Sequence, residues 1–383
     1  MIILKKFISY IVITILIFTS YCFNSNAEGE NDLLSLNCPS AILMDYESGE
    51  VLYEKNPDEI RAMASVTKIM TLLICMEEIN AGNISYDDIV TGSANAKSYG
   101  GSTIFLDEGE KISVRDLLKG IAVASGNDAS VAMAEYVSGS ESAFVLRMNE
   151  TAKRLGMINT NFVNCNGLDE DGHYSTARDI AIMSRELMKY NDIFQFTTIW
   201  MDSLRNGTFT LSNTNKLIKY YDGATGLKTG STDNARFCIS ATAKRDNMHL
   251  IAVIMGAETS KLRQADAVTL LNYGFNNYLS ETIVDSENYS RIISVEKGEK
   301  NSVAIIPKSD YCIVKEKNCD DAFSCKLSLK KRFNAPINKG DCAGYIIIEN
   351  NGKEVDRVEL IFSSSVTKCG FWKQFRNNLL KVF

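Results

Sequence analysis

The spacing of apolar and polar residues divides the chain into a mixed region and a strand-rich region. Two short strands at residues 41–45 and 51–54 flank the turn residues Ser48 and Gly49, which is typical of a β-hairpin. A helix is predicted over residues 65–80, where apolar side chains recur at helical spacing. Further helices are expected at residues 114–124, 128–137, 143–155, 177–189 and 261–278, and two more strands at residues 237–242 and 249–255.

Helices enclosed between two sets of strands indicate an α+β fold over residues 38–280, with an antiparallel sheet backed by helices. After about residue 280 the helical spacing disappears, and turn residues separate short strand-like runs. This pattern predicts a second, small all-β domain at residues 283–365. Its strands are expected at residues 292–295, 303–306, 312–314, 327–329, 345–348 and 355–362.

The N-terminus has the organisation of a secretory signal peptide. Lys5 and Lys6 precede an apolar run at residues 7–18, and Ser25 and Ala27 place small residues at the −3 and −1 positions of a cleavage site. The run is shorter than the roughly 20 residues that cross a bilayer. We therefore expect removal of residues 1–27 and export of the protein, with an uncleaved N-terminal anchor as the alternative.

Residues 368–383 form an amphipathic pattern at the other terminus. Large apolar side chains share one helical face and cations lie largely elsewhere: Phe371, Trp372, Phe375, Leu379 and Phe383 against Lys373, Arg376 and Lys381. A helix of this length is too short to cross a bilayer, and its pattern is typical of a helix that lies in the membrane interface. The alternative is a terminal helix that packs on its own domain.

Charge and cysteine content narrow the function. A formal net charge of −6 argues against a general affinity for nucleic acid, which needs a basic surface. The 10 cysteines form no C-x-x-C pair and no metal-ligand spacing, so most are expected to be small buried apolar side chains. Cleavage after Ala27 would remove Cys22 and leave an odd number, and a bridge between Cys312 and Cys342 stays open.

Three short motifs follow one another in an order that suits a serine nucleophile assisted by lysine. Ser65-Val66-Thr67-Lys68 begins a predicted helix, Ser125-Gly126-Asn127 lies in a loop between helices, and Lys228-Thr229-Gly230 stands just before a strand. Residues i and i+3 share a helical face, so the Lys68 amine can lie beside the Ser65 hydroxyl and take its proton. Burial and the charge of Lys228 would both lower the pKa of Lys68 and keep its amine neutral.

The other motif residues have complementary roles in this chemistry. Ser125 can relay a proton toward the leaving amine, and Asn127 can hold either the substrate amide or Lys68. Lys228 places a positive charge near the substrate carboxylate. The backbone N–H groups of Ser65 and Ser231 are candidate donors to the oxyanion of the tetrahedral intermediate.

Histidine is scarce, since the chain contains only His173 and His249. A Ser-His-Asp triad would depend on His173, and no G-x-S-x-G elbow accompanies it. His173 is therefore interpreted as a structural residue that holds its loop by hydrogen bonds. No H-E-x-x-H motif is present, and we expect neither a metal nor a cofactor.

Together these motifs resemble those of low-molecular-mass penicillin-binding proteins, the serine D-alanyl-D-alanine carboxypeptidases. The resemblance includes residues 64–68, 125–128 and 228–232, and also the intervening segment 166–179, which contains Gly167-Leu168-Asp169 and His173-Tyr174-Ser175-Thr176-Ala177-Arg178-Asp179. It covers residues 38–280 strongly and the β domain and tail in general plan.

The resemblance implies a penicillin-recognising serine hydrolase fold with a sheet, backing helices and a helical lobe. Ser65 would be acylated by the penultimate D-alanine of a peptidoglycan stem peptide, the terminal D-alanine would leave, and β-lactam antibiotics would inhibit covalently. The protein would act at the outer face of the cytoplasmic membrane. The substrate site would comprise Lys228, Thr229, Gly230, Ser231 and Thr232, and the terminal carboxylate would bind Thr232 and Arg263.

Other functions share part of this chemistry. A class A β-lactamase needs a Glu in an E-x-x-x-N loop for fast deacylation, and no such sequence stands between the second and third motifs. A non-catalytic peptidoglycan-binding or sensor module would be expected to lack a catalytic residue, and none is missing. A transpeptidase would differ only in using an amine in place of water as the acyl acceptor. The sequence therefore favours the carboxypeptidase.

Overall fold

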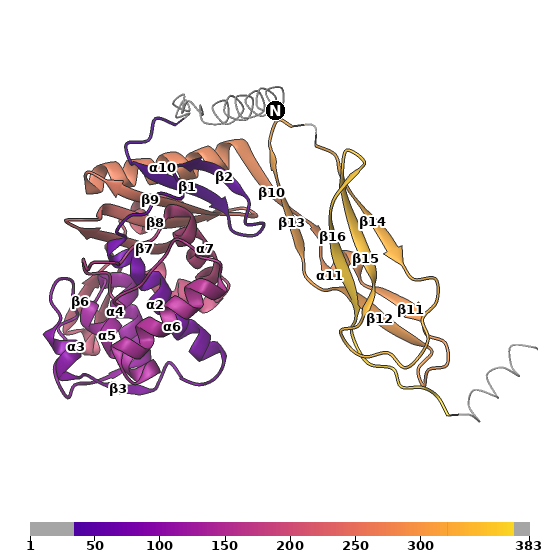
Figure 1. The fold of residues 1–383 in the computed structure, drawn as a ribbon, viewed down its shortest axis with the longest axis horizontal. Coiled ribbons are helices and arrows are strands. Elements are labelled where there is room, and N and C mark those ends of the chain that lie inside the picture. Colours follow the sequence, from indigo (N-terminus) through magenta and orange to yellow (C-terminus); the bar gives the residue numbers. More distant parts are fainter. Residues whose placement is uncertain (1–33, 320, 371–383) are drawn as a thin grey trace, which may run out of the picture. The chain divides into compact units, whose positions relative to one another are not determined.

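The computed structural model describes residues 34–319 and 321–370 (Figure 1). The predicted signal peptide and residues 371–383 of the predicted amphipathic tail lie outside this range. Within the part that is described, no helix has both the length and the apolar character needed to cross a bilayer.

A five-stranded antiparallel sheet forms the centre of the first domain, in the order β2-β1-β9-β8-β7. Every residue of β9 is buried, because both faces of the sheet are covered. Leu250 faces the long helix α10, whereas its neighbour Ile251 joins the core of a helical lobe on the opposite face (Figure 1). These elements are β1 (Ser40–Asp45), β2 (Val51–Lys55), β7 (Ala224–Thr232), β8 (Arg236–Arg245), β9 (Met248–Ala257) and α10 (Ser260–Asn277).

The helical lobe is built around α2 (Lys68–Asn80), in which the residues from Lys68 to Met76 are all buried. Ser113, Ser140 and Thr176 each accept a hydrogen bond from a backbone N–H three residues on, which starts helices α4, α6 and α7 at these positions. The lobe and its edges comprise η1 (Ala64–Thr67), β3 (Ile89–Thr91), α3 (Ala94–Ser98), β4 (Lys111–Ser113), α4 (Val114–Ala124), α5 (Asn127–Ser138), α6 (Glu141–Arg154), α7 (Ala177–Met188), η2 (Asn191–Ile193), α8 (Phe194–Thr197), β5 (Met201–Leu204), η3 (Arg205–Gly207), β6 (Phe209–Ser212) and α9 (Leu217–Tyr220).

The second domain is an antiparallel sheet in the order β11-β12-β16-β15-β14, accompanied by the separate strand pair β10 and β13. Apolar side chains such as Ile305, Ile346 and Leu360 are fully buried in its core. Its elements are β10 (Tyr278–Val284), α11 (Ser286–Tyr289), β11 (Arg291–Ser294), β12 (Ser302–Pro307), β13 (Tyr311–Glu316), β14 (Phe323–Leu329), β15 (Cys342–Asn350) and β16 (Lys353–Phe362).

The predicted α+β fold with a following β-rich part is confirmed, and the expected helices agree with the observed ones within three residues at each end. The motif Lys228-Thr229-Gly230 precedes the expected strand, now β8, but it also lies inside a strand that the sequence pattern does not predict, β7. The motif is polar and buried, so it breaks the apolar pattern by which a strand is identified. The nine cysteines of the described residues are all free thiols, and Cys312 and Cys342 belong to different sheets.

Candidate active site

Ser65 and Lys68 lie at the point where the short helix η1 passes into α2. The Lys68 Nζ atom lies 3.0 Å from the Ser65 Oγ atom, as the i, i+3 spacing predicts. Lys68 is fully buried, although it carries an amine. Burial lowers the pKa of Lys68 to about 7, so a large fraction of the amine is neutral near physiological pH.

Two further partners of Lys68 fix the direction of its amine. Its Nζ atom lies 2.7 Å from Asn127 Oδ1 and also donates to the backbone carbonyl of Asn166. Both oxygens can only accept, so they take the two N–H bonds of the neutral amine. The lone pair is then directed toward the Ser65 hydroxyl, which is the arrangement a general base requires.

Asn127 is held by the loop between α3 and β4. Its Nδ2 donates to the carbonyl of Gly100 at 2.7 Å, and its backbone N–H donates to the carbonyl of Ser102 at 2.7 Å. The first bond defines the orientation of the amide and leaves Oδ1 toward Lys68. The next residue, Asp128, accepts hydrogen bonds from the backbone N–H groups of Ile104 and Leu106.

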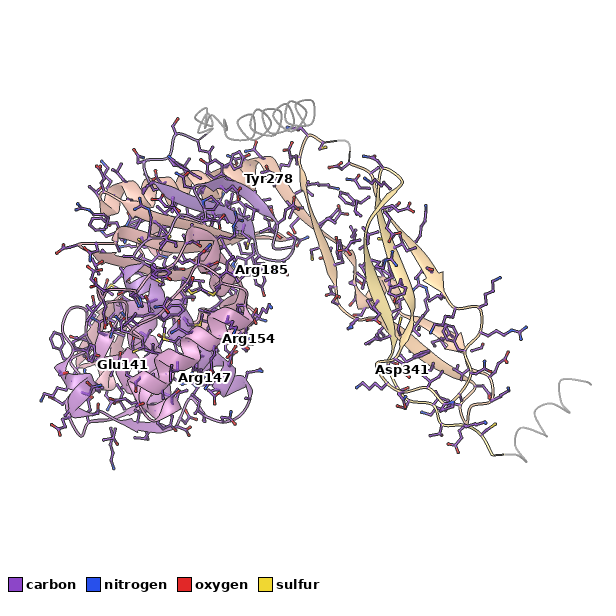
Figure 2. The ribbon with its side chains drawn as sticks, viewed as in Figure 1. Glu141, Arg147, Arg154, Arg185, Tyr278 and Asp341 are labelled. Atoms are coloured by element: carbon purple, nitrogen blue, oxygen red, sulfur yellow. The ribbon has the colours of Figure 1, made fainter. Side chains whose placement is uncertain are left out.

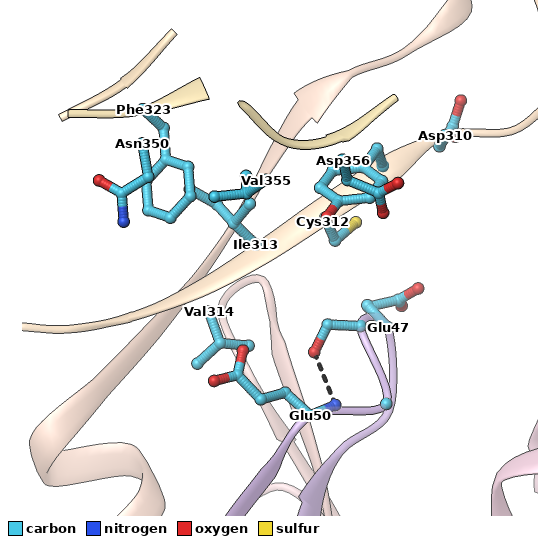
Figure 3. Close-up of a pocket in the computed structure, with 13 residues that line it drawn as sticks. Glu47, Glu50, Asp310, Cys312, Ile313, Val314, Phe323, Asn350, Val355 and Asp356 are labelled. Atoms are coloured by element: carbon cyan, nitrogen blue, oxygen red, sulfur yellow. Dashed lines mark hydrogen bonds between the residues drawn. The ribbon is translucent and has the colours of Figure 1, made fainter. Parts of the chain in front are cut away.

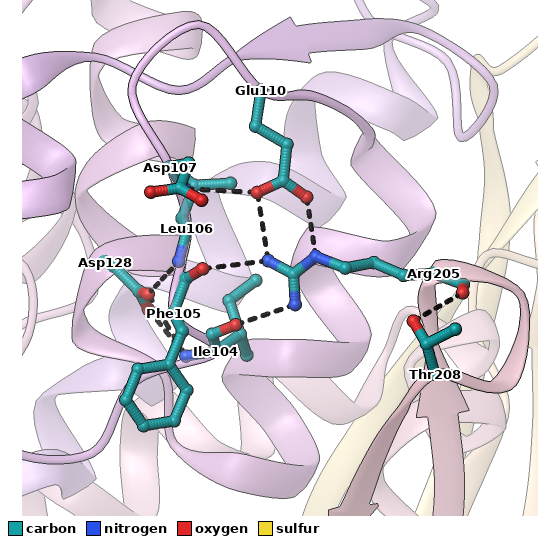
Figure 4. A network of polar contacts seen from close by, with 8 residues as sticks. All are labelled: Ile104, Phe105, Leu106, Asp107, Glu110, Asp128, Arg205 and Thr208. Carbon is teal, nitrogen blue, oxygen red and sulfur yellow. Dashed lines mark hydrogen bonds and ion pairs between the residues drawn. The ribbon is translucent and has the colours of Figure 1, made fainter.

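Arg205 supports the same loop from the opposite side (Figure 4). Its guanidinium binds the carboxylate of Glu110 through two bonds of 2.7 and 3.0 Å. It also donates to the carbonyls of Ile104 and Phe105, at 2.9 and 3.0 Å. The loop that orients Asn127 is therefore held by a buried carboxylate on one side and a bidentate arginine on the other.

Ser125 caps the C-terminus of α4 with a left-handed backbone, φ 64°. The side chain is almost completely buried, at 4% exposure. Within residues 34–319 and 321–370, its hydroxyl has no hydrogen-bond partner. Because the hydroxyl is not occupied, it is available to a substrate or to a proton in transit.

Strand β7 lies directly against the nucleophile. A Cβ atom on Gly230 would lie 2.7 Å from the backbone N of Ser65, so only glycine lets the strand approach so closely. This contact places the exposed Ser231 next in the strand, consistent with an oxyanion site between the N–H groups of Ser65 and Ser231. Lys228 is buried and donates to the carbonyl of Thr229 at 2.9 Å. Burial, together with the charges of Lys68 and Arg263, holds the pKa of Lys228 well below its usual range.

The two residues expected to bind a carboxylate lie in different environments. The Thr232 hydroxyl donates to Asp169 Oδ1 at 2.6 Å. Arg263 is only 5% exposed, and its Nη1 lies 3.4 Å from the carbonyls of both Gly230 and Cys238. Burial lowers the pKa of Arg263 to about 10, so the side chain is still a cation at neutral pH. Arg263 is thus not a solvated helix residue, and it supports β7 from within the domain.

The loop between α6 and α7 supplies the carbonyl of Asn166 and is itself tightly fitted. A Cβ on Gly167, at φ +86°, would lie 2.0 Å from the carbonyl oxygen of Ala64. His173 Nδ1 accepts from the N–H of Val163, so the proton of the neutral ring is on Nε2, which lies 2.7 Å from Thr67 Oγ1. Burial lowers the pKa of His173 to about 4. These bonds agree with a structural role for His173.

Glu141 is a supporting residue that the sequence did not reveal (Figure 2). One carboxylate oxygen accepts from the Tyr99 hydroxyl at 2.6 Å, and the other accepts from the backbone N–H of Cys165 at 3.4 Å. Tyr99 precedes the carbonyl that binds Asn127, and Cys165 precedes the carbonyl that binds Lys68. Glu141 therefore joins the two loops that orient the base. Its place after the helix cap Ser140 was the only local signal.

A separate cavity of about 550 Å³ is lined by residues of the β1–β2 turn and of the β domain (Figure 3). Four carboxylates face it, from Glu47, Glu50, Asp310 and Asp356. None of the three motifs contributes a residue to this cavity, and it therefore has no part in the chemistry described above.

Two family models match the chain. The model described as D-alanyl-D-alanine carboxypeptidase matches residues 26–259, and the model described as Penicillin-binding protein 5, C-terminal domain, matches residues 279–368. The D-alanyl-D-alanine carboxypeptidase DacF of Bacillus subtilis (strain 168) is 40% identical over 374 residues and covers 96% of each chain. The D-alanyl-D-alanine carboxypeptidase DacC of Escherichia coli (strain K12) is 33% identical and covers 90% of this chain and 88% of its own.

Solved structures agree with the sequence matches. The crystal structure of penicillin binding protein 5 from Haemophilus influenzae has a TM-score of 0.73 at 32% identity, covering 87% of this chain and 98% of that chain. The match therefore spans both domains and the three motifs. The chain belongs to the D-alanyl-D-alanine carboxypeptidase family.

Proposed function

We propose that this protein is a serine D-alanyl-D-alanine carboxypeptidase that removes the terminal D-alanine from peptidoglycan stem peptides. One observation carries the proposal: a buried amine with a pKa of about 7 lies 3.0 Å from a serine hydroxyl, and its other two partners are acceptors. Such an amine can remove the hydroxyl proton. Membership of the carboxypeptidase family supports the same reaction.

Acylation begins when Lys68 takes the proton of Ser65 and the oxygen attacks the carbonyl carbon of the penultimate D-alanine. The N–H groups of Ser65 and Ser231 then bind the oxyanion, and losing one such donor typically costs about 10²–10³ in rate. The proton passes from Lys68 through the Ser125 hydroxyl to the leaving nitrogen. The C–N bond breaks, free D-alanine departs, and the stem peptide is left as an ester on Ser65.

Deacylation reverses the roles. Lys68 takes a proton from a water molecule, the hydroxide attacks the ester carbonyl, and the proton returns to the Ser65 oxygen as the C–O bond breaks. A neutral Lys68 is therefore needed in both half-reactions. Replacement of water by an amine would give transpeptidation from the same intermediate.

The terminal carboxylate of the substrate would lie along β7. A carboxylate arriving there would raise the depressed pKa of Lys228 and restore its positive charge. Thr232 can contribute its hydroxyl once this turns away from Asp169. Arg263 is too deeply buried to reach far into solvent, so we assign it a supporting role, through its charge and its contact with the carbonyl of Gly230.

The test is a time course of intact mass after addition of a penicillin, followed by a D-alanine release assay. We expect a long-lived adduct on the wild type, no adduct on Ser65→Ala, and loss of D-alanine release in the same variant. Consumption of the antibiotic without a lasting adduct would favour a β-lactamase. An untouched antibiotic together with absent D-alanine release would favour a non-catalytic peptidoglycan-binding module.

We further propose that the protein is exported by its N-terminal segment and held at the outer face of the cytoplasmic membrane by residues 368–383. The support is the signal-peptide pattern at residues 1–27 and the amphipathic pattern of the tail. Deletion of residues 370–383 should abolish most co-sedimentation with lipid vesicles. Unchanged sedimentation of the deletion variant would refute the anchor.

A further inference from the structure

Three segments of the β domain meet at one end of its five-stranded sheet. They are residues 296–301, residues 330–341 and residues 363–370. The N–H of Glu296 donates to the carbonyl of Phe333 at 2.8 Å, and the N–H of Ile337 donates to that of Val366 at 2.9 Å. We call these three segments the basic end.

The basic end carries many exposed cations that have no acidic partner. In the described ranges 34–319 and 321–370, none of them forms a salt bridge. The cations are Lys297, Lys300, Lys330, Lys331, Arg332, Lys339 and Lys368, and the carboxylates beside them are Glu296, Glu299 and Asp341. The three segments together have a net charge of +4, whereas the whole chain has a formal net charge of −6.

Two of these carboxylates accept hydrogen bonds from uncharged donors of the basic end. Glu299 accepts from the Thr367 hydroxyl at 2.7 Å, and Asp341 accepts from the backbone N–H of Asn338 at 3.0 Å. Figure 2 labels Asp341 at this end of the sheet. Seven cations against three carboxylates leave the positive charge of the basic end without local balance.

Three cations elsewhere in the same sheet, Lys308, Lys326 and Arg357, do have an acidic partner. Lys308 pairs with Glu359 at 2.7 Å, and Lys326 pairs with Glu349 at 2.6 Å. A solvated face that served only for solubility would be expected to mix both signs, as the rest of this sheet does. Segregation of unpaired cations at one end instead indicates a negatively charged partner.

The position of the tail identifies the kind of partner. The N–H of Cys369 donates to the carbonyl of Lys297 at 2.9 Å, so the chain enters residues 371–383 directly from the basic end. We propose that the basic end is a docking surface for a bilayer that contains anionic phospholipids, in addition to the proposed contact of the tail. The inference rests on the proposed export and membrane attachment. Cations near such a surface are attracted over about one Debye length, close to 10 Å at 0.1 M salt.

The experiment compares vesicles containing phosphatidylglycerol with vesicles of phosphatidylcholine alone, using residues 28–383. The variant K330Q/K331Q/R332Q removes three cations of the basic end. The control K308Q/K326Q/K353Q removes three cations from the rest of the same sheet, so both proteins change in charge equally. Penicillin adduct formation in solution is measured on each protein as a check of fold and of the proposed function.

We expect the basic-end variant to lower the anionic-to-neutral partition ratio on the order of 100-fold at low salt, because each cation contributes about five-fold. The control should change the ratio much less, and the difference should shrink at 1 M salt. Equal ratios for the two variants would overturn the inference, as would binding of soluble polyphosphate that matches binding to anionic vesicles. If lipid binding follows this pattern while no penicillin adduct forms, the membrane-docking role of the basic end is supported and the proposed catalytic function is refuted.

Discussion

The pKa of Lys68 gives the sharpest quantitative prediction. If the neutral amine is the general base, the rate constant for acylation by penicillin follows the fraction of neutral Lys68. With a pKa of about 7, that fraction is about 9% at pH 6 and about 91% at pH 8. The rate constant should therefore rise about ten-fold between these values and level off above pH 8.

A lysine with an ordinary pKa near 10.4 predicts a different curve. Its neutral fraction would rise about 100-fold from pH 6 to pH 8, with no plateau in this range. The slope and the plateau therefore distinguish the two cases. His173 cannot mimic the transition, because burial lowers its pKa to about 4.

The assay is stopped-flow or quenched-flow acylation, quantified by intact mass, from pH 5.5 to pH 9. Lys68→Arg is the matched variant, since a guanidinium stays charged throughout and has no lone pair to offer. We expect it to acylate about 10²–10⁴ times more slowly, without a break near pH 7. A flat wild-type profile, or an Arg variant with the wild-type break, would refute the assignment of Lys68 as base.

Substitutions of three residues that hold the loops around the active site give further predictions. Glu141→Gln puts an amide where two donors need acceptors, so acylation should fall about ten-fold, and an unchanged rate would contradict the bridging role. Arg205→Ala should slow acylation several-fold. The matched control is Arg178→Ala, because Arg178 binds the carboxylate of Asp58 through two bonds but lies away from the loop of Asn127; equal effects would exclude a specific support. Gly167→Ala should lower the unfolding free energy by about 3 kcal/mol, or Tm by roughly 6–12 °C, because its Cβ meets a backbone oxygen at 2.0 Å. Gly139 also has a positive φ, but a Cβ there would meet nothing within 4 Å, so Gly139→Ala should lower the unfolding free energy by only about 1 kcal/mol. Equal losses for the two variants would show that the backbone moves to relieve the contact at Gly167.

Features that depend on a fixed spacing of side chains could be predicted from the sequence. Apolar periodicity located α4 and α7 almost to the residue, because this signal is local. The pairing of Ser65 with Lys68 required only that a helix begin there. Lys228 was assigned a role, but its strand was not recognised, because a buried lysine breaks the alternation on which strand prediction depends.

The backbone carbonyls that orient Lys68 and Asn127 could not be predicted in this way. The carbonyl of Asn166 is separated from Lys68 by 98 positions in sequence, and every residue type offers such a carbonyl. The same is true of the carbonyl of Gly100, which orients Asn127. Only the neighbouring glycines, such as Gly167, are a signal in the sequence. A glycine indicates that two parts of the backbone approach closely, but it does not identify the second part.

The reactivity of Ser65 therefore depends less on the motif than on what surrounds the amine of Lys68. A lysine three residues from a serine on a helix is common, and in water it would be protonated. Here burial lowers the pKa of the amine to about 7, and two oxygens that can only accept, from Asn127 and Asn166, take up both N–H bonds of its neutral form. If either oxygen were lost, the lone pair could turn away from Ser65 while the amine stayed neutral. Loop supports such as Glu141 should then change the rate of acylation more than they change the pH at which it levels off.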